Sequence, residues 1–181
     1  VPMDRRSDAL TAAAEAILAV ESYCSKVPGL VGTVGRISAA PGAVNVIPGD
    51  AAFTIDIRAG DDNLRRKALN DIKVEIKALC VRRGVEIEMG TIHESDGCQC
   101  APWLIDQLDA AVTTSGHPQK RLMSGAGHDG MAMEYITDIG MLFIRCEGGI
   151  SHHPAEAISV ADADAGAQAL LNFIKNFKPQ T

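Results

Sequence analysis

The chain has 181 residues, and its hydrophobic and charged fractions, 46% and 22%, are those of a globular protein and not of a disordered one. Its 17 Lys and Arg against 23 Asp and Glu give a net charge of −6, which, with 4% aromatic residues, excludes a footprint for nucleic acid or anionic lipid. No apolar run approaches the ~20 residues of a membrane span, and five irregularly spaced cysteines favour a reducing cytoplasm over a disulfide framework.

The first predicted element is an amphipathic helix over residues 8–22, whose apolar side chains recur at helical spacing. Ser7 is a plausible N-cap, because its hydroxyl can accept a bond from the first turn. Pro28 and Gly29 then break the helical pattern. The helix is therefore expected to end before these two residues.

Two strand-like segments follow, over residues 30–38 and 51–58. The second alternates apolar side chains, from Ala51 to Ile57, with polar ones that end at Arg58. Turn sequences rich in Pro and Gly lie between the two segments. This alternation predicts an antiparallel sheet that is covered on one face only.

A long amphipathic helix is predicted over 61–83, with Asp61 as its N-cap and Gly84 at its end. Residues 85–89 alternate Val, Ile and Met with Glu, which predicts a further strand. The order is then α, β, β, α, β. This is the order of a βαββαβ sandwich that lacks its first strand.

The composition changes at residues 95–101, and the pattern beyond is that of an α/β domain. Helices are predicted over 102–115 and 159–177. The apolar run at 139–146 predicts a strand buried on both faces of a parallel sheet. The fold class is therefore α/β, with an α+β part followed by an α/β part.

The run GGISHHPAE at 148–156 follows directly on the predicted buried strand. Ligand sites in open α/β sheets gather beyond such strand ends, and a neutral imidazole there suits zinc or a similar divalent metal. In the alternative interpretation, one of His152 and His153 is a surface residue and the other caps the next turn. Cys98 and Cys100 could be half of a soft-metal site, but no second half follows.

The run SGAGHDG at 124–130 is rich in glycine and leads into a short predicted helix over 131–135. Its backbone N–H groups could face an anion or an oxyanion. In the equally weighted alternative, Asp129 caps that helix and His128 is structural. The run is not a phosphate loop, because the Gly-Lys-Ser/Thr signature is absent. It is not a serine nucleophile elbow either, because Ser124 precedes the glycines and does not lie between them.

Asn45 and Arg58 form the third candidate pair. Arg58 ends the alternating strand on its polar face, and Asn45 lies in the turn region before it. A guanidinium and an amide could together clamp a substrate carboxylate. The alternative is that Arg58 pairs with a neighbouring carboxylate, Asp56 or Asp61.

Five segments together resemble the C-terminal part of allantoate amidohydrolases and of the related N-carbamoyl-L-amino acid hydrolases, members of the dinuclear metal-dependent aminoacylase and exopeptidase superfamily. The resemblance covers nearly the whole chain. Its last two segments favour allantoate amidohydrolases over the ureidoglycolate enzymes. The segments are VPM…RRSDAL…AAAEAIL at 1–18, PGAVNVIPG at 41–49, DIR at 56–58, SGAGHDGMAM at 124–133 and MLFIRCEGGISHHPAE at 141–156.

The resemblance implies a role for each candidate residue. His152 is expected to be a metal ligand, with His153 only its neighbour. Asn45 and Arg58 are expected to reach across a dimer and bind the substrate carboxylate of the partner subunit. The remaining implied residues are the loop whose backbone lines the substrate pocket, Gly125, Ala126 and Gly127, and the two residues that hold this loop, His128 and Asp129.

The resemblance also implies a domain organisation. Residues 1–95 are expected to be a lid or dimerisation domain, incomplete at its N-terminus, and residues 96–181 the C-terminal part of a metallopeptidase-like catalytic domain. Family members extend further at the N-terminus, where they carry the other ligands of two zinc or manganese ions and the general-base glutamate. The chain starts at Val1 and not at Met, so it is expected to be a fragment with one metal ligand.

The implied activity belongs to the intact enzyme, a cytoplasmic homodimer joined through its lid. A metal-bound water, deprotonated by a glutamate, is expected to attack the carbamoyl carbon of allantoate, a small ureido carboxylate of purine catabolism. The alternatives are an N-carbamoyl-L-amino acid hydrolase, an aminoacylase relative, or a non-catalytic dimerisation or binding module. Because the first lid strand is missing, an open sheet edge is also expected to promote association.

Overall fold

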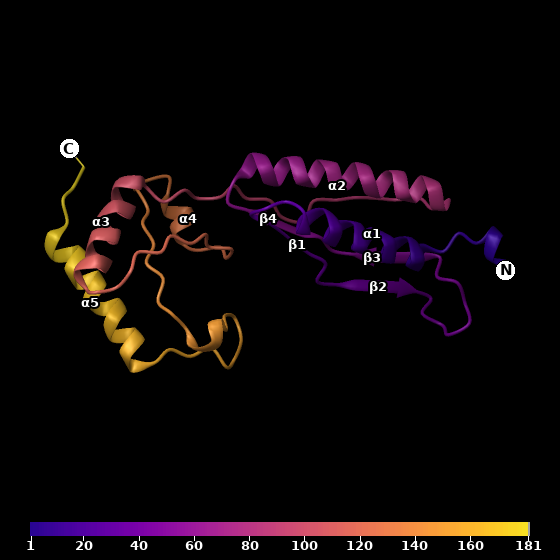
Figure 1. The fold of residues 1–181 in the computed structure, drawn as a ribbon. Coiled ribbons are helices and arrows are strands. Elements are labelled where there is room, and N and C mark those ends of the chain that lie inside the picture. Colours follow the sequence, from indigo (N-terminus) through magenta and orange to yellow (C-terminus); the bar gives the residue numbers. More distant parts are fainter. Residues whose placement is uncertain (181) are drawn as a thin grey trace. The chain divides into compact units, whose positions relative to one another are not determined.

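The computed structural model describes residues 1–180, which form two compact units divided between Gly97 and Cys98 (Figure 1). The first unit opens with a short 3-10 turn, η1 (Met3–Arg5), and is built from two long helices and four short strands. The second unit holds three helices and a 3-10 turn within the described residues. Among these residues, no helix combines the length and the apolarity that crossing a membrane requires.

The first helix, α1 (Ala9–Ser25), begins one residue later than predicted. Asp8, and not Ser7, is the N-cap, and its carboxylate accepts bonds from the backbone N–H groups of Leu10 and Thr11 at 3.1 and 3.0 Å. An Asp in extended backbone satisfies these otherwise unpaired donors as well as Ser does. The helix also runs three residues beyond the predicted end at 22.

The second helix, α2 (Asp62–Arg83), confirms its predicted signals at both ends. Asp61 caps the first turn, accepting from the N–H of Asn63 at 2.7 Å. Gly84 ends the helix in the left-handed region, at φ 63°, with its N–H bonded to the last turn. That backbone conformation is strained for residues with a Cβ, so glycine is the residue expected there.

The strands form one broken antiparallel ribbon. Strand β1 (Leu30–Thr33) pairs with β4 (Asp56–Ala59), and β2 (Ile37–Ala40) pairs with β3 (Asp50–Phe53). Each predicted strand is thus interrupted once, although the N–H of Thr54 still bonds the carbonyl of Arg36 at 3.1 Å across the break. The predicted alternation is confirmed along β3 and β4, where half-buried and exposed residues alternate.

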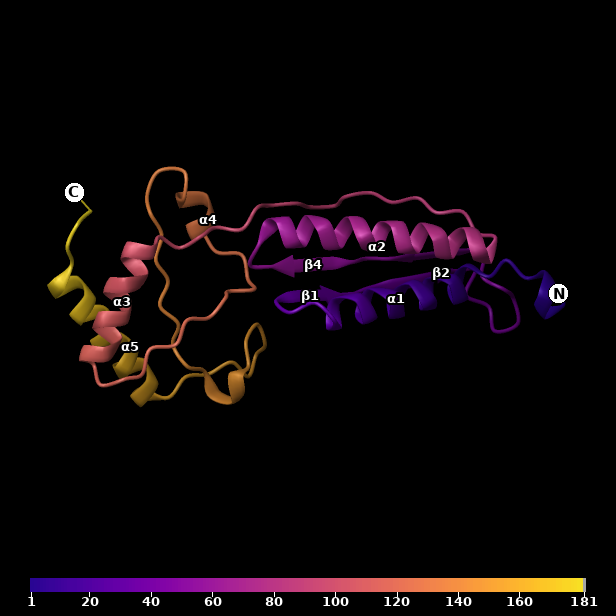
Figure 2. The ribbon, with the colours of Figure 1, turned by 45° about the horizontal axis from the view of Figure 1, so that its top comes forward.

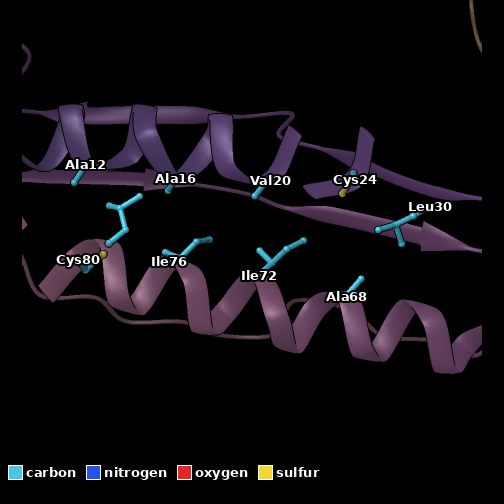
Figure 3. Packing of buried hydrophobic residues seen from close by; sticks show 10 residues of the cluster. Ala12, Ala16, Val20, Cys24, Leu30, Ala68, Ile72, Ile76 and Cys80 are labelled. Carbon is cyan, nitrogen blue, oxygen red and sulfur yellow. The ribbon is translucent and has the colours of Figure 1, made fainter. Parts of the chain in front are cut away.

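Both helices cover the same face of this ribbon and pack against each other (Figures 1 and 2). Helix α1 presents small side chains, and these let it approach Ile72 and Ile76 of α2, each only 1% exposed (Figure 3). Such close packing leaves few voids. The buried cluster consists of Ala12, Ala16, Val20, Cys24, Leu30, Ala68, Ile72, Ile76, Leu79 and Cys80.

Gly32 of β1 has no room for a side chain. A Cβ there would overlap the Cys24 Sγ and lie 3.2 Å from the Ile57 Cδ1. Gly32→Ala should therefore lower the free energy of unfolding by about 1–3 kcal/mol, the usual cost of overpacking. Urea denaturation measures this loss. Gly35→Ala is the control, because nothing lies within 4 Å of its Cβ position, and equal stabilities of the two variants would contradict the packing at Gly32.

The strand predicted at 85–89 is not formed, and this prediction is wrong. The segment is extended and runs back along α2 without pairing with a described strand (Figure 2). Alternation predicts an extended backbone but does not supply a partner edge. The segment's far end is fixed instead by Arg65, whose guanidinium contacts Glu94 at 3.2 Å and Asp96 at 3.3 Å.

In the second unit, α3 (Pro102–Thr114) packs against α5 (Val160–Asn176), with α4 (Gly130–Met133) and η2 (Glu147–Gly149) between them in the chain. Pro102 occupies the first turn of α3, as predicted. Ser159 caps α5 by accepting from the N–H of Asp162 at 3.0 Å, which confirms that start signal. Asn172 donates to Ser115 Oγ at 2.8 Å and joins the two long helices.

The prediction of a buried strand at 139–146 is also wrong for the described residues. Residues 98–180 of the second unit form no strand, and Phe143 and Ile144 are 48% and 44% exposed. A strand buried on both faces needs neighbouring strands that accept its backbone bonds. Within the part of the second unit that the structure describes, no such strand lies beside it.

Candidate functional site

Arg58 lies on the polar face of β4 beside Asp56. Its Nε donates to Asp56 Oδ1 at 2.9 Å and its Nη2 donates to Oδ2 at 2.7 Å. The two side chains are 54% and 50% exposed. The interpretation in which Arg58 pairs with a neighbouring carboxylate is thus confirmed for Asp56, and the guanidinium is held in one orientation while remaining accessible to solvent.

This pair stays charged over the physiological range. The hydrogen bond from Arg58 lowers the pKa of Asp56, and the same bond raises the pKa of Arg58. A lowered folded-state pKa means that the pair is intact above the ordinary aspartate pKa of about 3.9 and is lost as the pH falls through the lower value. At neutral pH both hydrogen bonds from Arg58 to Asp56 are therefore formed between charged groups.

Asn45 lies in the loop at 41–49 that joins β2 to β3, in a turn closed by the N–H of Val46 and the carbonyl of Ala43 at 3.3 Å. Arg58 comes eight residues after Asp50, where β3 begins. At ~3.3 Å per residue, extended backbone of that length spans roughly 26 Å. The loop after β2, which carries Asn45, and the strand β4, which carries Arg58, therefore lie towards opposite ends of the ribbon (Figure 1).

The glycine-rich loop leads into α4 and is held by local hydrogen bonds. The N–H of Ala126 donates to Ser124 Oγ at 3.3 Å. The carbonyls of His128 and Asp129 accept from α4, at 2.9 Å from Met131 N and 3.0 Å from Ala132 N. The side chains of His128 and Asp129 are exposed. Asp129 occupies the N-cap position of α4, as the capping interpretation has it, but its side chain makes no capping hydrogen bond.

His152 has a left-handed backbone, with φ 57°, which is rare for a residue with a Cβ. Its N–H donates to Glu156 Oε2 at 2.8 Å, and its Nδ1 lies 2.7 Å from Ser151 Oγ. Such backbone strain gathers at functional sites. His153 instead accepts the N–H of Ala155 at Nδ1, at 3.1 Å, as expected of a histidine that caps the following turn.

No sequence pattern singled out Glu156 beforehand, yet its carboxylate fixes the backbone that carries His152. Its place four residues after that histidine was the available signal. The described residues include no group of three or more His, Cys, Asp or Glu side chains that could hold a metal ion. By itself, His152 does not make the two-metal site that the resemblance implies, so the residues present do not fit that site alone.

Comparison with known proteins extends these observations. The model of peptidase family M20/M25/M40 matches residues 7–176. Allantoate deiminase from Arabidopsis thaliana is 39% identical over 203 residues, covering 97% of this chain and 39% of the relative. N-carbamoyl-L-amino-acid amidohydrolase from Pseudomonas sp. (strain NS671) is also 39% identical, over 176 residues that cover 96% of this chain and 42% of the relative.

The crystal structure of AtUAH in complex with glyoxylate superposes with a TM-score of 0.81 at 33% identity, covering 97% of this chain and 42% of that one. This superposition and the family match over residues 7–176 confirm the predicted fold class. That relative binds a small molecule. The chain spans about two fifths of the length of the curated relatives it matches.

Proposed function

Because the chain belongs to peptidase family M20/M25/M40, we propose that it is part of a hydrolase that cleaves the ureido C–N bond of allantoate. Residues 1–95 would form the lid or dimerisation domain, and residues 96–181 the C-terminal part of the catalytic domain. The observation that carries the proposal is the Arg58 guanidinium, half exposed and fixed in orientation on β4. A planar fork of N–H donors suits a substrate carboxylate.

Asn45 is the proposed second contact of this carboxylate. Since its loop lies beyond Asp50, and Asp50 is roughly 26 Å of extended backbone from Arg58, the two residues would meet at one substrate only when they come from two chains. A two-fold symmetric pair would place each loop at 41–49 near the partner's β4. The separation within one chain therefore supports a homodimer formed through residues 1–95.

The backbone of Gly125, Ala126 and Gly127 would line the substrate pocket, with the carbonyls of His128 and Asp129 holding the loop on α4. His152 would be this chain's ligand to one of two divalent ions, zinc or manganese, since imidazole suits both. The strained backbone of His152 and its bond to Glu156 support this role. We place the enzyme in the cytoplasm, where the five free cysteines would stay reduced.

Hydrolysis of N-carbamoyl-L-amino acids is a second candidate, because a relative with that name is as identical to this chain as the allantoate deiminase is. Both substrates present a carboxylate and a ureido group. A non-catalytic dimerisation module is a third candidate, because the described residues include no group of three or more His, Cys, Asp or Glu side chains that could hold a metal ion.

The shared site can be tested by mixing two inactive variants. Asn45→Ala and Arg58→Ala should each impair the complete gene product. After subunit exchange, about a quarter of the sites should regain both residues, because half of the dimers are mixed and one site of each is intact. Activity should rise to about a quarter of the wild-type value. No recovery, despite mixed dimers seen by native mass spectrometry, would contradict a site shared between chains.

A further inference from the structure

We propose that Asp56 is a positioning residue, which sets the orientation in which Arg58 receives the substrate carboxylate. The inference rests on the proposed function of Arg58 and adds a residue that this function does not include. Asp56 bonds two separate donors of the guanidinium, Nε at 2.9 Å and Nη2 at 2.7 Å. Two contacts fix the plane of the group, whereas one contact would leave it free to turn.

The geometry of β4 makes this contact possible. Residues 56 and 58 are separated by two positions, so both side chains leave the strand on the same, exposed face. Their partners across the ribbon are Thr33 and Val31 of β1, which are also exposed. The helices cover the other face, where Ile57 packs against the buried cluster. The pair is therefore open to a ligand or a second chain.

The contact does little for the stability of the fold. Both partners belong to one strand and are about half exposed, and such ion pairs contribute little to the free energy of unfolding. Other arginines in this unit do join separate elements: Arg83 pairs with Glu15 across α2 and α1. Arg58 holds no two elements together through Asp56. What Asp56 fixes is the direction of the Arg58 side chain, which is a feature of a binding group.

The test compares Asp56→Ala with wild type in the complete, metal-loaded gene product, using the ureido carboxylate that the wild type hydrolyses. We expect kcat/KM to fall about tenfold while the melting temperature stays unchanged. The same compound with a carboxamide in place of the carboxylate should be hydrolysed equally by both proteins. In the Arg58→Ala background, Asp56→Ala should cause no further loss. Asp50→Ala, another exposed aspartate of the ribbon, is the matched control.

Asp56→Asn keeps one acceptor oxygen, so its kcat/KM should lie between those of the alanine variant and wild type. It serves as a second variant if the alanine protein folds poorly. The proposal is overturned if these variants retain wild-type kcat/KM while Arg58→Ala does not. It is also overturned if Asp56→Ala lowers kcat/KM for the carboxamide as much as for the carboxylate. Additive losses of kcat/KM from Asp56→Ala and Arg58→Ala in the double variant would overturn it too. A folded wild type that hydrolyses no ureido carboxylate overturns the proposed function and, with it, the role of Asp56.

Discussion

Replacing Arg58 by alanine should lower kcat/KM for the ureido carboxylate about 10- to 100-fold in the complete gene product. A hydrogen-bonded contact between charged groups contributes about 1.5–3 kcal/mol to binding, and Arg58 is the group on β4 that can offer two parallel N–H bonds to a carboxylate. The loss should appear mainly in KM if the contact is equally strong in the ground state and the transition state. Steady-state kinetics of ammonium release measure both constants.

Two further variants show whether the loss of activity comes from the charge and geometry of Arg58 or from the removal of any exposed arginine of the ribbon. Arg58→Lys keeps the charge but not the planar fork, so it should recover only part of the lost activity. Arg36→Ala removes another exposed arginine of the same ribbon, from the connection between β1 and β2, and should leave the kinetics unchanged. If Arg58→Ala behaves like Arg36→Ala, the proposed contact with the substrate does not exist.

Ile72→Ala should be the most destabilising single substitution in the first unit, with a loss of about 2–5 kcal/mol in the free energy of unfolding. Ile72 is 1% exposed and lies in the middle of α2, facing the small side chains of α1 (Figure 3). Those side chains are too short to fill the space that a smaller residue at position 72 would leave. Removing three carbons would therefore leave a cavity between the helices as well as a loss of buried apolar area.

Urea denaturation followed by circular dichroism measures this loss, with Val74→Ala as the control on the same helix, since Val74 is 60% exposed. The control should change stability by less than about 0.5 kcal/mol. Ile76→Val removes one methylene at a position just as buried and should cost about 0.5–1.5 kcal/mol. An Ile72→Ala protein within 1 kcal/mol of wild type, by the same measure, would contradict the packing of α1 on α2.

The helices could be predicted because their signals are local. Asp61 and Gly84 lie at the two ends of α2 as predicted, since capping depends on side chains within one turn. The cap of α1 was misplaced by one residue because Ser7 and Asp8 offer similar chemistry, and only the backbone conformation selects between them. Helical spacing also gave the buried face of α2 correctly, but α1 buries Ala12, Ala16 and Val20. Its larger residues Leu10 and Leu18, which the spacing placed on the apolar stripe, are 38% and 62% exposed.

The strands could be predicted only in part, because a strand needs a partner that the sequence pattern does not name. Alternation gave the correct faces for β3 and β4. The same kind of pattern at 85–89 gave an extended segment without pairing, and the apolar run at 139–146 remained unpaired as well. Backbone hydrogen bonding between strands is non-local, and it decides whether an extended segment becomes a strand.

In the candidate site, too, residue types could be predicted from the sequence, whereas their arrangement in space could not. Sequence chemistry selected Arg58 and Asn45 as groups for a carboxylate, but it could not reveal that the ribbon separates them within one chain. It also offered Asp56 only as an alternative partner for Arg58, whereas the structure has a two-point contact between them. The left-handed backbone of His152 and its bond to Glu156 depend on local folding that residue types alone do not encode.

Ammonium release from allantoate decides whether this chain is part of a hydrolase of ureido carboxylates, as we propose. The measurement uses the complete gene product, purified with zinc or manganese, and compares allantoate with an N-carbamoyl-L-amino acid. We predict ammonium release from allantoate with the higher kcat/KM, and a strong loss on Arg58→Ala. A folded, metal-loaded dimer that releases ammonium from neither compound would contradict the proposed function.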